Sequence, residues 1–225
     1  MRKLFVILLL IMSVGGWMAC NNKGASQDQA AENQESKISP EELNKSLTEL
    51  QDLKAKFDAA ETEKDKDDLM TQLSGKVQLL LSKAPNNPEA NAMMDNVQMY
   101  YAMAWAKQAK YKKAIEIVDN VLQFSPNNDE AKKMKAQFEN WEFMTRDEFN
   151  MIKKHMYMDE VTKIAGYPLR KETKTDKYKR TVHGWFYKEP SMNKAVAIWF
   201  DVNGQVWATK WPKGTKDVKA TGAGN

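Results

Sequence analysis

The spacing of the apolar residues changes once along this chain of 225 residues, and this change limits the folds that it can adopt. From Leu43 onward, apolar side chains recur every three or four residues, which is the period of an amphipathic helix. From Arg180 onward they alternate with other residues, which is the period of a half-buried strand. The sequence therefore predicts an α+β protein, with helices first and a small antiparallel sheet after them.

The predicted helices contain an ending motif that occurs twice. Residues Ala84–Ala90 read Ala-Pro-Asn-Asn-Pro-Glu-Ala, and Ser125–Ala131 repeat them 41 residues later as Ser-Pro-Asn-Asn-Asp-Glu-Ala. Two helices precede the first copy, two lie between the copies, and a last helix spans residues 129–143. Short helical hairpins bury their apolar faces only by stacking on their neighbours, so a stack of helices is expected.

Residues 41–143 resemble tetratricopeptide repeats (TPR), a family of stacked helical hairpins. The residues that carry the resemblance are Tyr101, Ala102, Trp105, Ala109, Tyr111, Ala114, Val121, Leu122 and Pro126. The resemblance implies a TPR-like helical domain that offers a groove to a peptide or a partner helix.

A second unit is predicted over residues 144–212. Thr145 and Glu148 form a capping-box pattern at the start of one helix, and a second short helix ends at Gly166. Three strand candidates follow, at residues 180–188, 194–200 and 205–211. The expected architecture is ααβββ, with a three-stranded antiparallel sheet.

This ααβββ order resembles the SmpA/OmlA (BamE-like) lipoprotein domain. The matching positions are Phe149, Ile152, Met156, Val161, Gly166, Pro168, Trp185, Tyr187, Phe200, Asp201 and Gly204. His155 and Tyr157 stand where the family has Gly and Thr. The resemblance implies a non-catalytic role in outer-membrane assembly or envelope integrity, through contacts with other proteins.

The turn at Asn203-Gly204 decides which tryptophans share a face of the sheet. A two-residue turn places Phe200 opposite Trp207, whereas a three-residue turn with Gly204 left-handed places Phe200 opposite Val206. The second turn is favoured, and it groups Trp199, Trp207 and Trp211 on one face. An aromatic surface is predicted to bind a partner, because Trp is enriched at interface hot spots; its residues are Trp185, Tyr187, Trp199, Trp207 and Trp211. The alternative is that the helices or the tail cover this aromatic surface.

Positive charge gathers in the second unit. Residues 21–144 carry 16 basic and 21 acidic side chains, whereas residues 145–225 carry 16 basic and 9 acidic ones. Residues 170–180 are predicted to form a basic loop before the first strand, with Arg170, Lys171, Lys174, Lys177, Lys179 and Arg180. This loop is expected either to contact anionic lipid or an acidic protein, or to be a solvated loop.

The N-terminal residues have the layout of a bacterial export signal: basic Arg2 and Lys3, an apolar run over residues 4–12, and small residues before Cys20. Ala19-Cys20 resembles a lipobox, which implies removal of residues 1–19 and acylation of Cys20, with palmitate among the acyl groups. By the same resemblance, Asn21 permits transfer to the outer membrane, facing the periplasm. An ordinary secretory signal is the alternative. Residues 20–40 are expected to form a polar, disordered tether and residues 213–225 a flexible tail.

Enzymatic activity is not expected. The chain has two histidines, His155 and His183, and one cysteine, which leaves too few ligands for a zinc or haem site. It has no Gly-rich phosphate loop and no Gly-x-Ser-x-Gly motif. We therefore predict no cofactor and no metal, and no nucleic-acid partner for an exported protein. The function expected is protein binding at the envelope; the alternative is an exported inhibitor or sensor module that binds a soluble enzyme or peptide.

Overall fold

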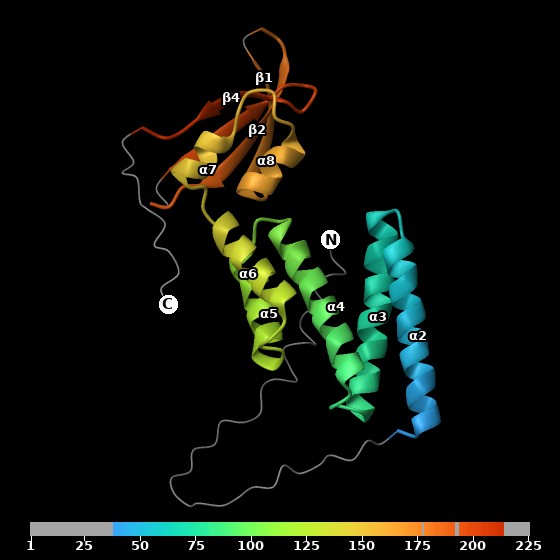
Figure 1. Cartoon of the computed structure of the whole chain (residues 1–225). Helices are drawn as coiled ribbons and strands as arrows, with labels where there is room; N and C mark the ends of the chain where they lie inside the picture. Colours follow the sequence, from blue (N-terminus) through green and yellow to red (C-terminus); the bar gives the residue numbers. More distant parts are fainter. Residues whose placement is uncertain (1–37, 177, 192–193, 214–225) are drawn as a thin grey trace, which may run out of the picture. The chain divides into compact units, whose positions relative to one another are not determined.

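The computed structural model describes residues 38–176, 178–191 and 194–213, and this part of the chain is α+β. Seven helices come first in the described residues and a four-stranded antiparallel sheet follows (Figure 1). The predicted signal peptide, Cys20, nearly all of the tether, Lys177 and the tail after residue 213 lie outside the described residues. Among the helices that are described, none combines the length and apolar character needed to cross a membrane.

Asparagine side chains set the helix starts in both copies of the repeated motif. The helices are α2 (Pro40–Ala59), α3 (Glu63–Lys83), α4 (Pro88–Ala106), α5 (Tyr111–Phe124), α6 (Asp129–Trp141), α7 (Arg146–Met151) and α8 (Met158–Ala165). Asn87 Oδ1 accepts a hydrogen bond from the Ala90 N–H at 2.9 Å, and Asn128 Oδ1 accepts one from the Ala131 N–H at 3.0 Å. The repeated sequence therefore provides a repeated N-cap, which was not predicted from the sequence.

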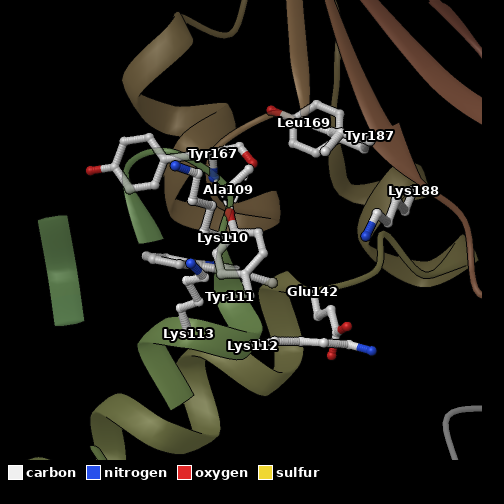
Figure 2. Close-up of a pocket in the computed structure, with 11 residues that line it drawn as sticks. Ala109, Lys110, Tyr111, Lys112, Lys113, Glu142, Tyr167, Leu169, Tyr187 and Lys188 are labelled. Carbon is white, nitrogen blue, oxygen red and sulfur yellow. Dashed lines mark hydrogen bonds between the residues drawn. The ribbon is translucent and has the colours of Figure 1, made fainter. Parts of the chain in front are cut away.

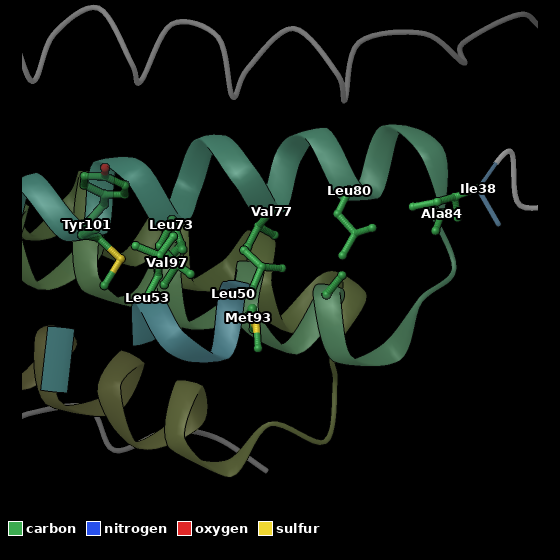
Figure 3. Packing of buried hydrophobic residues seen from close by; sticks show 12 residues of the cluster. Ile38, Leu50, Leu53, Leu73, Val77, Leu80, Ala84, Met93, Val97 and Tyr101 are labelled. Atoms are coloured by element: carbon green, nitrogen blue, oxygen red, sulfur yellow. The ribbon is translucent and has the colours of Figure 1, made fainter. Parts of the chain in front are cut away.

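The first three helices share one apolar core (Figure 3). Leu50 and Leu53 of α2 pack with Val77 of α3 and with Met93 and Val97 of α4, and all five are buried. Each of helices α3–α6 also packs on the helix before it in the sequence. Each apolar stripe is thus covered by a neighbouring helix, which is the stacking that short hairpins need.

The sheet has one strand more than predicted. Its order is β1 (Arg170–Thr175), β2 (Thr181–Lys188), β3 (Ala195–Phe200) and β4 (Val206–Lys210), with every neighbouring pair antiparallel. The expectation of a three-stranded sheet was wrong, because β1 occupies half of the predicted basic loop. Its sequence, Arg-Lys-Glu-Thr-Lys-Thr, has no apolar residue, so alternation gave no signal; charged side chains are typical of an edge strand.

The turn between β3 and β4 has the favoured geometry, but the faces of β4 differ from the expectation. Gly204 is left-handed, with φ at 76°, and Phe200 pairs with Val206 as predicted. A β-bulge then pairs Trp199 with Ala208, so Trp207 has no partner across the strands. Beyond the bulge, the Trp211 ring lies 5.3 Å from the ring of Phe149 in α7. The predicted grouping of Trp199, Trp207 and Trp211 on one face was therefore wrong.

Helices α7 and α8 cover one face of the sheet (Figure 1). The core between them contains Met144, Ile152, Val161, Ala165, Trp185, Tyr187, Val196, Ile198, Phe200 and Val206. The segment before α8 also bonds to β4: the His155 N–H donates to the Val206 carbonyl at 2.9 Å, and the Val206 N–H donates to the Met156 carbonyl at 2.8 Å. His155 adopts φ of 70°, which lies in the left-handed region.

One tyrosine hydroxyl joins α5 to the segment after α8. The Tyr111 hydroxyl donates to the Tyr167 carbonyl at 2.8 Å and accepts from the Tyr167 N–H at 2.6 Å. The chain comes this close because Gly166, at φ of 68°, has no side chain there. A Cβ atom on Gly166 would lie 2.5 Å from Trp141 Cγ and 2.6 Å from the Tyr111 hydroxyl.

Gly166→Ala should therefore lower the free energy of unfolding by about 2–4 kcal/mol, through backbone strain and overpacking against Trp141. Gly75→Ala is the matched control: it lies inside α3 with open space around it, and it should stabilise by about 0.5–1 kcal/mol. Urea denaturation of both variants measures the difference. Equal effects would show that the contact around Gly166 is not tight.

Burial also affects a carboxyl group at the start of α7. Glu148 Oε2 accepts a hydrogen bond from the Thr145 N–H at 2.8 Å, and the Glu148 N–H donates to Thr145 Oγ1 at 3.2 Å, which forms the predicted capping box. Thr145 Oγ1 also donates to Glu148 Oε2 at 2.9 Å. The other carboxyl oxygen of Glu148, Oε1, is buried without a hydrogen-bond partner among the described residues. Desolvation by burial raises the pKa of Glu148, although the bonds from Thr145 oppose the shift.

A carboxyl whose pKa is raised on folding favours the folded state while protonated, and this contribution is lost as the pH rises through the folded-state pKa. Glu148→Gln keeps a capping oxygen and does not titrate. The stability of this variant relative to wild type should therefore increase from about pH 4 to about pH 7, by roughly 1.4 kcal/mol per unit of pKa shift. Urea denaturation at both pH values tests this; a constant difference would contradict it.

Candidate functional site

One cavity in the helical part is lined by methionines from three helices. It has a volume of about 460 Å³. We call it the methionine pocket, and its sulfur-bearing residues are Met70 of α3, Met93, Met99 and Met103 of α4, and Met134 of α6. Phe57, Leu73 and Tyr100 add further apolar surface. The volume falls within the range of about 300–1,000 Å³ that is usual for ligand sites.

Helical spacing brings the α4 residues to one side. Met93, Asn96, Tyr100 and Met103 follow one another at intervals of three or four residues, so they lie on one face of α4. The sequence shows this spacing, and an abundance of Met in helices favours an adaptable core. It does not show that α6 comes close enough to place Met134 beside the α4 residues.

The pocket combines a rigid wall with adaptable side chains. The Tyr100 ring meets the Phe57 ring edge-on at 5.4 Å, and the Tyr100 hydroxyl donates to Asp67 Oδ1 at 2.6 Å. Met103 and Met134 are only partly buried, so their side chains can reach an occupant. Methionine has an unbranched, polarizable side chain that repacks around different apolar partners. The arrangement can therefore receive apolar side chains of more than one shape.

The rim of the methionine pocket is polar and carries a surplus acidic group. Lys54 Nζ lies 2.7 Å from Asp58 Oδ2, so these two charges neutralise each other. Glu130 is exposed and forms no ion pair within the described residues. An apolar segment with a nearby basic residue fits this rim best.

The structure divides the predicted aromatic surface between two faces of the sheet. Trp185 and Tyr187 are buried, with 7% and 3% of their surface exposed, and belong to the core beneath α7 and α8. Trp211 packs on Phe149 on this side too. The helices of the same unit therefore cover Trp185 and Tyr187, whereas Trp211 is partly buried.

Trp199 lies on the opposite face of the sheet and Trp207 beside it at the bulge. The Trp199 ring covers Gly184, where a Cβ atom would come within 2.6 Å of the ring, and it meets Phe186 edge-on at 5.6 Å. Trp207 is 42% exposed. Phe186 was not among the predicted site residues, although strand alternation places it opposite to Trp185 and Tyr187.

The predicted basic loop contributes its cations to these rings. The guanidinium of Arg170 lies 4.1 Å from the Phe186 ring centre, and Lys174 Nζ lies 5.4 Å from that of Trp199. Arg180 stands 5.2 Å from the Trp207 ring and also pairs with Asp176 at 2.6 Å. Lys171 faces the other way, 4.9 Å from the Trp185 ring. Four cations of residues 170–180 thus make cation–π contacts with aromatic rings of the same sheet.

Neither histidine lies in a cluster suited to metal binding. His183 Nδ1 hydrogen-bonds Thr173 Oγ1 at 3.1 Å, and His155 is exposed. No group of three or more His, Cys, Asp or Glu side chains that could hold a metal occurs in the described residues.

Comparisons of the chain with protein-family models, with curated proteins and with solved structures gave no match. The resemblances to TPR and BamE-like proteins therefore stay predictions, and the fold class alone does not define a function.

The two classes of tryptophan should differ in their effect on stability. Trp185→Ala removes a buried ring and should lower the free energy of unfolding by about 3–5 kcal/mol. Trp207→Ala removes an exposed ring with one cation contact and should cost about 1 kcal/mol or less. Thermal and urea unfolding of both variants measures the contrast. A large loss with Trp207→Ala would show that this ring is part of the core.

Proposed function

We propose that this protein is a lipid-anchored bacterial envelope protein that binds other proteins and catalyses no reaction. The observation that carries the proposal is the methionine pocket, whose five Met side chains line a cavity of about 460 Å³ on the helical stack. Adaptable apolar pockets of this kind suit peptide or helix recognition. The occupant proposed is an apolar segment of a partner protein with a basic residue beside it, because Glu130 leaves the rim acidic.

The anchor proposed is the acylated Cys20. Each buried methylene contributes about 0.8 kcal/mol, and one chain gives only marginal binding, so a triacylated cysteine holds a protein to its membrane. Restriction to one membrane surface raises the effective concentration of a partner on that surface. The TPR-like and BamE-like resemblances support a role in outer-membrane assembly or envelope integrity at the periplasmic side.

The test is affinity capture from detergent-solubilised envelopes. A variant with Met103→Lys and Met134→Lys places two cations beside the apolar walls, so it should lose a partner that wild type retains. Met151→Lys is the control, since Met151 is exposed on α7 and does not line the pocket. Circular dichroism checks that each variant is folded.

Capture of the same proteins by wild type and by the Met103/Met134 variant would contradict the role of the pocket. The anchor is tested separately in the same preparations by intact mass. Wild type should carry the mass of acyl chains at Cys20 and sediment with membranes, whereas Cys20→Ala should do neither. An unmodified wild-type cysteine would overturn the lipoprotein assignment and leave the pocket proposal to stand on the capture result.

A further inference from the structure

A second cavity lies near the Tyr111–Tyr167 hydrogen bonds (Figure 2). Its volume is about 280 Å³, and its lining comes from the start of α5, the end of α6, the segment after α8 and the end of β2. We call it the aromatic–lysine pocket. It shares no residue with the methionine pocket, so inference about it does not rest on the function proposed above.

Four aromatic side chains form the walls: Tyr111, Trp141, Tyr167 and Tyr187. The Tyr111 hydroxyl is fixed by the Tyr167 backbone, and the Tyr187 hydroxyl donates to the Gly166 carbonyl at 3.4 Å. The Trp141 and Tyr167 rings meet edge-on at 6.0 Å. The polar ends of Tyr111 and Tyr187 are therefore used internally. Tyr111, Trp141 and Tyr187 are buried, so the partly exposed ring of Tyr167 is the one that can meet a ligand.

Positively charged side chains outnumber negatively charged ones at this cavity. Lys110, Lys112, Lys113 and Lys188 line it, with Glu142 as the one carboxylate among the lining residues. Lys110 and Lys113 stand over the Trp105 ring, with Nζ at 4.5 and 5.0 Å from its centre. Within the described part of the chain, Lys112 and Lys188 form no ion pair, and Lys188 is partly buried.

The geometry points to a binding site for a small organic acid with a planar apolar body. Its carboxylate would be held by Lys112 and Lys188, and its body would lie against Tyr167 and Leu169, which is 56% exposed at the cavity. A cluster of cations beside a low-dielectric wall favours an anion, because clefts lined by one sign of charge concentrate ions of the other. Planar apolar groups pack well on aromatic rings, so charge and shape select the same class of ligand.

The test is an NMR titration of the isotope-labelled full-length protein in detergent micelles, with benzoate as the probe. Benzamide is the matched neutral control, since it has the same ring and no charge. Benzoate should shift the amide signals of residues 109–113, 167 and 169, and benzamide should bind about tenfold more weakly or not at all. The affinity for benzoate should fall as salt is added.

Lys112→Gln and Lys188→Gln should each weaken benzoate binding by about two- to fivefold, as expected for solvent-accessible ion pairs, and leave benzamide unaffected. Lys132→Gln is the control, since Lys132 pairs with Asp129 on α6 and does not line the cavity. Equal binding of benzoate and benzamide, shifts confined to other residues, or wild-type affinity in both lysine variants would overturn the proposal.

Discussion

Helix stacking is the constraint on which the described structure depends. Leu50 and Leu53 on α2, Val77 on α3 and Val97 on α4 are buried only because three successive helices bring their apolar stripes together. The Asn87 and Asn128 caps support this stacking at the points where the chain reverses. Each side chain accepts a hydrogen bond from a backbone N–H in the first turn of the next helix, which has no partner within that helix. The methionine pocket is a product of the same stacking, since its residues lie on α2, α3, α4 and α6.

The link between α5 and the segment after α8 depends on one glycine. Gly166 lets the chain pass close to Trp141, and this places the Tyr167 backbone within reach of the Tyr111 hydroxyl. Burial raises the pKa of Tyr111, so the hydroxyl stays neutral and can both donate and accept. The same close approach arranges the ring surfaces of the aromatic–lysine pocket.

Sequence periodicity and local motifs predicted the helices, the Thr145–Glu148 capping box and the left-handed Gly204 turn, because each depends on residues close together in the chain. It missed β1, since an edge strand of charged and polar residues has no apolar alternation and is recognised only by its pairing with β2. It also misplaced Trp211, because the bulge beside Trp199 adds a residue to β4 and reverses the faces beyond it. The cavities depend on contacts between helices that are far apart in the sequence. The sequence therefore showed the spacing of the methionines along each helix, but not that they line one cavity.

The central claim is that the methionine pocket holds a segment of a partner protein at the envelope. The most direct measurement is site-specific photo-crosslinking in intact cells, with a photoreactive amino acid at position 103 inside the pocket and, separately, at position 151 outside it. The account predicts a defined protein adduct from position 103 alone, crosslinked through an apolar segment beside a basic residue. The same adducts from both positions, or none from position 103, would contradict it.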